Sequence, residues 1–329
     1  MIVRKIQKFI SLAILVSICL FPPANSFYES DKTVDLAGKG ISVRLHEPIV
    51  KELGLKTRFV RIPENDSDFI NENSEFLIVG TQPEKHINCI LNSIHKYKKI
   101  LCEKPVGVSY AEIENLEKLI EDSKTQIRVN YQLRFHPKLK EISDFARNNT
   151  IKTLKISYMS NFGNALAAQD WKNDMKTGGG IIYSILPHII DAINFLELNA
   201  GSKPISQVET TDENNIPMTN IKVYFNSFML IDLDVTQKFD EFTFTFVTDD
   251  GQEKVFDLIA DNELFSENHQ YSNGYLLSKN DCSFWRKCFK NLLETFFRDP
   301  DDCRLTTLAD AKKVLYTIDE ILKIVLNNQ

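Results

Sequence analysis

Short apolar runs alternate with segments of helical periodicity along the chain from Lys32 to about residue 133. Strands are predicted for KTVDLAG, KTRFVRI, SEFLIVGT, KILCEKP and TQIRVNYQLRF, and the third is as apolar as a parallel strand covered on both faces. Helices are predicted for ISVRLHEPIVKELG, PEKHINCILNSIHKYK and SYAEIENLEKLIEDSK, the last with Ser109 as its N-cap. This alternation predicts an α/β domain, residues 27–133, with a Rossmann-like doubly wound parallel sheet.

The pattern changes after residue 133 to longer runs that are typical of antiparallel strands. Strands are predicted for IKTLKISYMSNF, QVETTDENN, IKVYFNSFMLIDLDVTQKF and EFTFTFVTDDGQEKVFDL, with Asp-Gly in the last as a hairpin signal. An amphipathic helix is predicted for TLADAKKVLYTIDEILKIVLNN at the end of the chain. We therefore predict a second, α+β domain, residues 134–329, with an open, mostly antiparallel sheet and a closing helix.

Residues 1–26 differ in pattern from both predicted domains. A basic start precedes an apolar run over residues 9–21, and the small residues Ala24 and Ser26 stand just before Phe27. This is the anatomy of a secretory signal peptide, and the run is shorter than the roughly 20 residues of a membrane span. We expect an exported or periplasmic protein. The alternatives are a membrane anchor or, if the start codon is mis-assigned, a cytoplasmic protein.

Composition narrows the class of partner. The 329 residues are 43% hydrophobic and 26% charged, enough for two domains with separate cores. The net charge of −6 and the scattered Lys and Arg residues give no basic stripe for nucleic acid. The six cysteines lack the spacing of a disulfide scaffold or a metal site, although Cys282 and Cys288 either pair or remain free thiols. We expect a small-molecule partner, no nucleic acid, no metal, and membrane contact only through the N-terminal segment.

Three predicted strands of the first domain end in residues suited to a nucleotide, and doubly wound sheets bind ligands beyond the carboxyl ends of their strands. Gly38 and Gly40 form a G-x-G turn that opens a helix, whose first amides favour phosphate. Val43 replaces the third glycine of that pattern, and a plain tight turn is the alternative. The expected cofactor-binding residues are Gly38, Gly40, Ile41, Ser42, Thr81, Gln82, Pro83, His86, Glu103 and Lys104. For the last two, the alternative is an ordinary surface ion pair.

A second candidate site follows the glycine run 178–180. A helix is predicted to begin near Pro187, and His188 and Asp191 are three residues apart, on one face of it. A histidine in a helix is either a satisfied core residue or a catalyst. The glycine run, Trp171 and the neighbouring carboxylate favour a catalyst.

Taken in order, the motifs resemble those of the Gfo/Idh/MocA oxidoreductase family. They are G-x-G-x-x-x-x-x-H (Gly38 to His46), T-x-P-x-x-H (Thr81 to His86), C-E-K-P (Cys102 to Pro105), N-Y-x-x-R-F-x-P (Asn130 to Pro137) and G-G-G…H-x-x-D (Gly178 to Asp191). The resemblance covers nearly all of the chain after residue 32. It implies a Rossmann domain, a second domain with an open sheet, NAD or NADP as cofactor, and a sugar-type substrate. We also expect a homo-oligomer that assembles through the C-terminal sheet.

By this resemblance, Lys104 would lie beside the nicotinamide and bind the reacting oxygen, and Pro105 would fix the turn that presents it. A cation at that place stabilises developing alkoxide charge, and neutral His188 can take the hydroxyl proton near neutral pH. Asp191 either orients the His188 ring or makes a structural contact. The expected substrate-binding residues are Lys104, Tyr131, Arg134, Trp171, Ser184, His188 and Asp191.

The chain departs from the family pattern in two further ways. Ser184 stands where members commonly have an aspartate four residues before the histidine, and a hydroxyl cannot hold negative charge. Too few residues separate the second and third strands for a helix–strand–helix insert, so we expect a first domain compressed by about one βα unit. For the cofactor, Arg58 or Arg61 would favour NADP and Glu64 would favour NAD; the choice stays open.

We therefore expect an NAD(P)-dependent dehydrogenase or reductase. It would transfer a hydride between the nicotinamide and a hydroxyl or keto carbon of a sugar, sugar nucleotide or polyol. The alternative is a catalytically weak nucleotide- or sugar-binding protein on the same scaffold. Ser184, the compressed first domain and the export signal favour that alternative, because a cell envelope offers little free dinucleotide.

Overall fold

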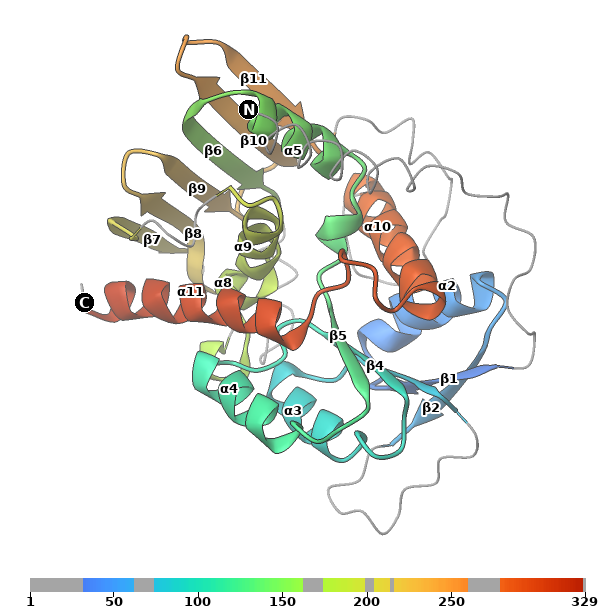
Figure 1. Cartoon of the computed structure of the whole chain (residues 1–329). Helices are drawn as coiled ribbons and strands as arrows, with labels where there is room; N and C mark the ends of the chain where they lie inside the picture. Colours follow the sequence, from blue (N-terminus) through green and yellow to red (C-terminus); the bar gives the residue numbers. More distant parts are fainter. Residues whose placement is uncertain are drawn as a thin grey trace, which may run out of the picture.

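The computed structural model describes residues 32–61, 74–161, 174–198, 204–213, 216–259 and 279–327. Within these ranges the chain forms two sheets with helices packed around them (Figure 1). The signal-like segment 1–26, Glu64 and Trp171 lie outside the described residues. None of the described helices combines the length and hydrophobicity that crossing a membrane requires.

The first sheet is parallel throughout, as the sequence predicts. Its strands are β1 (Thr33–Ala37), β2 (Lys56–Val60), β3 (Phe76–Val79), β4 (Lys99–Glu103) and β5 (Gln126–Asn130). Their order is β2-β1-β3-β4-β5, so the chain reverses direction across the sheet between β1 and β3. A six-stranded dinucleotide-binding sheet has the order 3-2-1-4-5-6, and loss of its third strand gives the order seen here. Over the described residues, this order agrees with the predicted compression by one βα unit.

Helices follow the strands of this sheet as the periodicity predicts. They are η1 (Ser42–His46), α2 (Glu47–Glu52), η3 (Pro83–Lys85), α3 (His86–Leu91) and α4 (Tyr110–Leu119). Ser109 caps α4 as expected, since its side chain accepts a hydrogen bond from the Glu112 amide. After β5, η4 (Gln132–Phe135) and α5 (Lys138–Asn148) lead into the second sheet.

The second sheet is mostly antiparallel, which confirms the predicted fold class. Its strands are β6 (Ile151–Met159), β7 (Gln207–Glu213), β8 (Ile216–Phe225), β9 (Met229–Asp234), β10 (Glu241–Thr248) and β11 (Glu253–Asp257), in the order β11-β10-β6-β9-β8-β7. Among the described pairs, β6 and β9 are parallel. Phe242, Phe244 and Phe246 alternate along β10 and bury one face of the sheet, in a core shared with α8 (Ile181–Ser184) and α9 (Leu186–Phe195).

The last two helices return from the second sheet to the first domain. The closing helix α11 (Leu308–Asn327) was predicted, and it contacts both α4 and α9. Sequence reasoning did not predict α10 (Lys279–Arg298), whose Phe289 and Phe296 share a core with Val34 and Leu36 of β1. The end of the predicted unit 134–329 therefore packs on the first domain. In α10, Cys288 is a buried free thiol, so the alternative of a Cys282–Cys288 pair is wrong.

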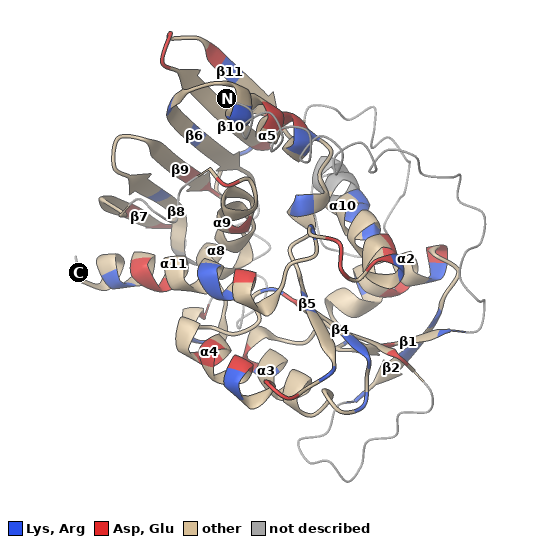
Figure 2. Ribbon diagram, in the orientation of Figure 1, with Lys and Arg blue, Asp and Glu red and all other residues tan. Residues whose placement is uncertain are grey.

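Charged residues of both signs are interspersed over the surface helices, including α4, α10 and α11 (Figure 2). Many form pairs within or between helices, such as Arg286 and Lys290 of α10 with Glu52 of α2. Mixed charge of this kind is typical of a solvated surface rather than a polyanion-binding face.

Candidate active site

The topology places three of the predicted site segments at one edge of the first sheet. Strands β1, β3 and β4 are neighbours, with Ala37 paired to Val79 and Val79 paired to Cys102. The residues that follow these strands therefore begin at the same level, and the Gly80 amide donates to the Ala37 carbonyl at 2.8 Å. The edge includes the point where strand order reverses, which is where doubly wound sheets bind ligands.

The two glycines after β1 have different roles. Gly38 has φ of +107°, and a Cβ there would lie 2.3 Å from the Gly80 oxygen, so the backbone itself requires glycine. Gly40 has open space: its nearest neighbour to an added Cβ is a guanidinium nitrogen of Arg44 at 4.0 Å. Helix begins directly after it at Ile41, which provides no side-chain cap. Buried Ser42 is committed to the protein, since its hydroxyl donates to the Ala37 carbonyl at 3.3 Å.

His86 joins two of the strand-end loops. Its Nδ1 lies 2.7 Å from the Pro105 carbonyl oxygen and its Nε2 lies 3.0 Å from the Thr81 carbonyl oxygen. The residue is 1% exposed, so this contact between the loops after β3 and β4 is buried. Burial lowers the pKa of His86, although the two carbonyl partners and nearby Glu103 oppose that shift. The geometry assigns His86 to the support of the site rather than to its surface.

Glu103 is buried, so the alternative of an ordinary surface pair with Lys104 is wrong. Its Oε1 lies 2.7 Å from His46 Nε2 and accepts a hydrogen bond of 2.7 Å from Asn130. Burial raises the pKa of Glu103, but the hydrogen bonds from His46 and Asn130 and the charge of Lys104 bring it below its usual value. An ionised carboxylate thus ties the first helix to β4 and β5.

Lys104 reaches from the end of β4 to the second domain. Its Nζ donates to the carbonyl oxygens of Tyr183, at 3.4 Å, and Ser184. Both carbonyls belong to α8, which leads directly into α9 and His188. The Lys104 charge also contributes to the lowered pKa of His188. The structure therefore brings the two predicted catalytic residues, far apart in sequence, to the same place.

His188 lies in an aromatic setting. The imidazole is 4% exposed, and its Nδ1 is buried with no hydrogen-bond partner among the residues that the structure describes. The Tyr131 ring packs edge-on at 5.8 Å between centroids, and the Trp285 ring lies at 5.0 Å with a 40° tilt. Burial, followed by the charge of Lys104, lowers the pKa of His188 well below its usual value. The ring is therefore neutral at neutral pH.

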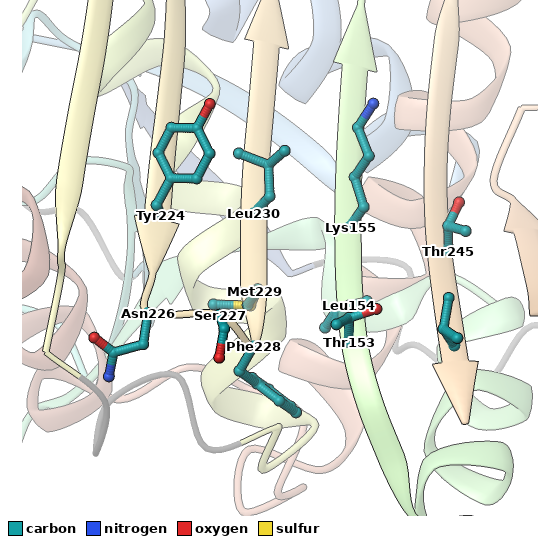
Figure 3. Close-up of a pocket in the computed structure, with 11 residues that line it drawn as sticks. Thr153, Leu154, Lys155, Tyr224, Asn226, Ser227, Phe228, Met229, Leu230 and Thr245 are labelled. Atoms are coloured by element: carbon teal, nitrogen blue, oxygen red, sulfur yellow. The ribbon is translucent and has the colours of Figure 1, made fainter. Parts of the chain in front are cut away.

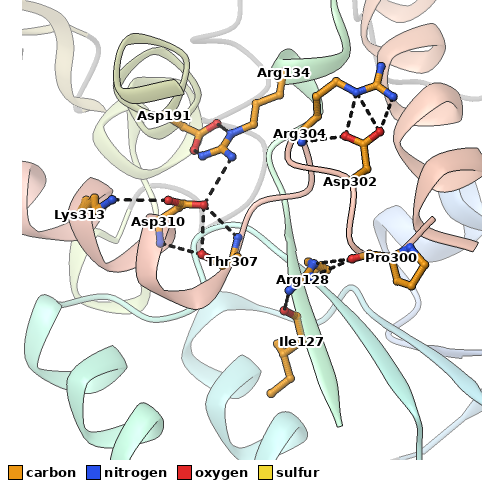
Figure 4. A network of polar contacts seen from close by, with 10 residues as sticks. All are labelled: Ile127, Arg128, Arg134, Asp191, Pro300, Asp302, Arg304, Thr307, Asp310 and Lys313. Atoms are coloured by element: carbon orange, nitrogen blue, oxygen red, sulfur yellow. Dashed lines mark hydrogen bonds and ion pairs between the residues drawn. The ribbon is translucent and has the colours of Figure 1, made fainter. Parts of the chain in front are cut away.

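Asp191 makes the structural contact that was one of its two predicted roles. Arg134 donates to both carboxylate oxygens, with Nε at 2.8 Å and a terminal nitrogen at 2.6 Å (Figure 4). Arg134 also lies 3.5 Å from an oxygen of Asp310 at the start of α11. Burial raises the pKa of Asp191 to about 6, although Arg134 opposes the shift. The predicted substrate contacts Arg134 and Asp191 thus satisfy one another, and they join η4, α9 and α11.

The remaining predicted residues differ in how far they reach the site. Tyr131 is fully buried beside His188, and its hydroxyl has no partner among the described residues. Ser184 is half-buried and contributes its carbonyl to Lys104. Arg58 donates to both oxygens of Asp35 in β1, at 2.9 and 2.8 Å, which removes it as an argument for NADP.

Trp285 belongs to the candidate site, yet sequence reasoning did not identify it. It lies in an amphipathic segment, CSFWRKCFKNLLETFFR, whose aromatic residues are as easily interpreted as core residues as site residues. Only its approach to His188 in space distinguishes it. Among the described residues, no cluster of His, Cys, Asp and Glu could hold a metal ion.

A separate hollow of about 320 Å³ lies on the second sheet. Side chains of β6, β8, β9 and β10 line it, including Lys155, Tyr224, Leu230 and Thr245 (Figure 3). None of the predicted site residues belongs to it, so it is distinct from the region around Lys104 and His188.

Comparison with known proteins agrees with this architecture. Residues 44–131 match the model of the oxidoreductase family with an NAD-binding Rossmann fold, Gfo/Idh/MocA. The chain is 25% identical over 160 residues to rhizopine catabolism protein MocA of Rhizobium meliloti, covering 48% of this chain and 49% of that protein. It is 22% identical over 164 residues to inositol 2-dehydrogenase of Rhizobium meliloti strain 1021, covering 50% and 46%. The chain thus spans about half the length of these curated relatives.

Solved structures share the fold over nearly the whole chain. GenD2 from gentamicin A biosynthesis, in complex with NAD, has a TM-score of 0.70 and 13% identity, covering 94% of this chain and 98% of that one. Scyllo-inositol dehydrogenase from Lactobacillus casei, with bound NAD(H) and scyllo-inositol, has a TM-score of 0.65 and 11% identity, covering 91% and 98%. The sequence match over residues 44–131 and the motifs at the strand ends thus make the first domain similar to the Gfo/Idh/MocA oxidoreductases with an NAD-binding Rossmann fold.

Proposed function

We propose that the protein is an NAD(P)-dependent oxidoreductase acting on a CH–OH or keto carbon of a sugar, sugar nucleotide or polyol. The observation that carries the proposal is the meeting of the Lys104 cation with the segment that presents neutral His188. Relatives support the substrate class, since they include an inositol 2-dehydrogenase and a structure that contains scyllo-inositol.

The residues at the strand ends fit a dinucleotide. Gly40 leaves open space before a helix whose first turn lacks a side-chain cap, which suits the approach of a phosphate. The Thr81–Gln82 loop follows β3 and Lys104 follows the neighbouring strand β4. The His86 ring contacts the carbonyl oxygens of both segments, at Thr81 and Pro105. These residues would hold the cofactor, which when bound supplies the hydride acceptor or donor. Since Arg58 is paired with Asp35, the choice between NAD and NADP rests on other residues.

Lys104 and His188 divide the work at the substrate oxygen. Removal of the hydroxyl proton by neutral His188 leaves charge on that oxygen, and the Lys104 cation stabilises it. Because the pKa of His188 is well below its usual value, the base stays neutral into mildly acidic solution. The acid limb of the rate profile therefore falls lower than the near-neutral position that the sequence alone suggests.

Direct binding measurements test the cofactor site. Gly40→Val should abolish NAD and NADP binding in calorimetry while changing the unfolding curve little, because an added Cβ at Gly40 meets no protein atom closer than 4.0 Å. Gly38→Ala serves as the contrast and should destabilise the fold itself, because its Cβ would collide with the Gly80 oxygen. Unchanged dinucleotide affinity in Gly40→Val would refute the assignment.

The reaction itself is tested by the absorbance of reduced nicotinamide with a panel of polyols and sugars, beginning with myo-inositol and glucose 6-phosphate. Turnover with any of them supports the proposal. The alternative function is a catalytically weak binding protein, which Ser184 in place of an acid favours. That alternative predicts dinucleotide binding and no turnover with any member of the panel.

Oligomerisation and export are further parts of the proposal. The outward face of the second sheet carries half-buried side chains such as Tyr224 and Leu230 around the hollow, and it would suit a second copy of the chain. Sedimentation of the wild type against Leu230→Glu tests this: a wild-type monomer would exclude it.

Export rests on residues 1–26, and N-terminal sequencing from the native host should give a chain that begins near Phe27.

A further inference from the structure

A catalytic imidazole needs its ring held in one orientation, and a hydrogen bond to its second nitrogen is the usual device. His188 has no such bond among the described residues, since its buried Nδ1 lacks a partner. Asp191, the nearest carboxylate along the helix, is engaged on both oxygens by Arg134. Among the described residues, no hydrogen bond to Nδ1 explains how the ring is fixed.

Aromatic packing supplies the missing restraint. The His188 ring lies nearly perpendicular to the Tyr131 ring and tilted by 40° against the Trp285 ring, at 5.8 and 5.0 Å between centroids. Trp285 in turn lies 6.4 Å from Phe242 of β10, with 32° between the ring planes, and Phe242 is fully buried. The indole is thus held between the core of the second sheet and the imidazole, where it limits rotation of the ring.

The helix that carries Trp285 is anchored in the first domain. Four residues further along α10, and so on the same face, Phe289 packs on the His46 ring at 4.9 Å. The His46 side chain is hydrogen-bonded to the carboxylate of Glu103, the residue directly before Lys104. The indole is therefore fixed relative to the strand end that presents the Lys104 cation. Helix α10 therefore connects the surroundings of His188 in the second domain to the surroundings of Lys104 in the first.

We propose that Trp285 is a positioning residue that holds the His188 imidazole in its productive orientation relative to Lys104. Its catalytic consequence rests on the proposed function, but the orientation of the ring can be measured without any substrate. Trp285 replaces the hydrogen-bonded carboxylate that would otherwise orient such a base. Through α10 it also fixes the position of the second domain relative to the first, near Lys104 and His188.

Nuclear Overhauser contacts from the ring protons of His188 test the orientation directly in histidine-labelled protein, with His188→Ala identifying the signals. The wild type should show one set of contacts to the Tyr131 and Trp285 rings, because only one ring orientation is permitted. Trp285→Leu should give contacts averaged over more than one orientation, and Trp285→Phe should restore a single set. Contacts from two exchanging orientations in the wild type, or one unchanged orientation in Trp285→Leu, would overturn the proposal. The wild-type result decides even if a variant fails to fold.

Kinetics extend the test to catalysis, using whichever panel compound the wild type oxidises. Trp285→Leu should lower kcat by about 10- to 100-fold with little change in dinucleotide affinity, the size expected for a misplaced catalytic group. Trp285→Phe should recover most of the loss, and Tyr316→Leu, at an exposed aromatic ring, is the matched control. In a His188→Ala background, Trp285→Leu should cost nothing further. An undiminished loss there contradicts positioning, whereas an absence of turnover in the wild type counts against the proposed function alone.

Discussion

The two halves of the candidate site are held together by different forces. At the strand ends of the first domain the contacts are polar: the His86 ring lies against the Thr81 and Pro105 carbonyls, and the Glu103 carboxylate contacts the side chains of His46 and Asn130. Around His188 in the second domain, the described contacts are packed rings, and the nearby carboxylate of Asp191 forms an ion pair with Arg134.

This difference has a physical consequence. In the first half the restraint is polar, so loss of one hydrogen-bond partner would leave a buried polar atom and a local penalty. Ring packing around His188 depends on segments that are distant in sequence, so its failure reorients the base without exposing an unpaired charge. On the proposed function, the first half would bind the cofactor and present the Lys104 cation, and the second would present the His188 base. Four tests would break or sharpen that contrast.

The largest effect should come from the reactive groups themselves. His188→Ala should lower kcat by about 10²- to 10⁴-fold, the range for loss of a general base. Lys104→Met should lower it by about 10²- to 10³-fold, the range for one charge-stabilising donor. Dinucleotide affinity, measured by calorimetry, should change little in either variant. Wild-type turnover in both variants would remove these residues from the mechanism.

The buried ion pair should matter for stability rather than for the rate. Asp191→Ala leaves Arg134 buried without its main partner, which should cost about 3–5 kcal/mol in urea unfolding. The exposed pair of Lys140 and Asp144 is the control, since Asp144→Ala should cost less than about 1 kcal/mol. If Asp191→Ala instead removed activity and kept full stability, Asp191 would act on the His188 ring.

The buried histidine should make the fold sensitive to acid. The folded pKa of His188 lies below 6.5, so its contribution to stability is complete above that pH. The contribution is lost as pH falls from 6.5 toward the folded pKa, because His188 binds a proton in the unfolded chain but not in the folded one. Asp191, with its raised pKa of about 6, acts in the opposite sense.

The His188→Gln variant isolates the histidine contribution. Relative to this variant, the wild type should lose up to about 1.4 kcal/mol of unfolding free energy per pH unit below about pH 6.5. Urea titrations at a series of pH values measure it. Parallel curves for the two proteins would show that His188 is not buried as a neutral ring.

The smallest effect is expected at Ser184. Its carbonyl already receives the Lys104 ammonium, so Ser184→Asp should leave that contact in place and add a carboxylate one turn before His188. Turnover should be preserved or raised, as measured by kcat on the substrate of the wild type. If the wild type shows no turnover and Ser184→Asp shows none either, the binding-protein alternative is favoured.

The sequence by itself determined the local elements and the strand-end half of the site. Apolar runs of strand length and helical periodicity specify each element of the first domain, and Ser109 specifies the start of α4 through a contact three residues away. Because parallel strands align their carboxyl ends, the motifs after β1, β3 and β4 had to meet. The positions of Gly38 and Lys104 at one edge of the sheet could therefore be predicted from the sequence.

Only the tertiary structure decided which partners the buried groups found. Asp191 could serve His188 or another cation, and the fold gives it to Arg134 from η4. Trp285 reads as an ordinary core residue until α10 folds back across the first domain. Periodicity reports that a side chain is buried, but not against what, because packing partners come from segments whose separation in sequence carries no record of their contact in space.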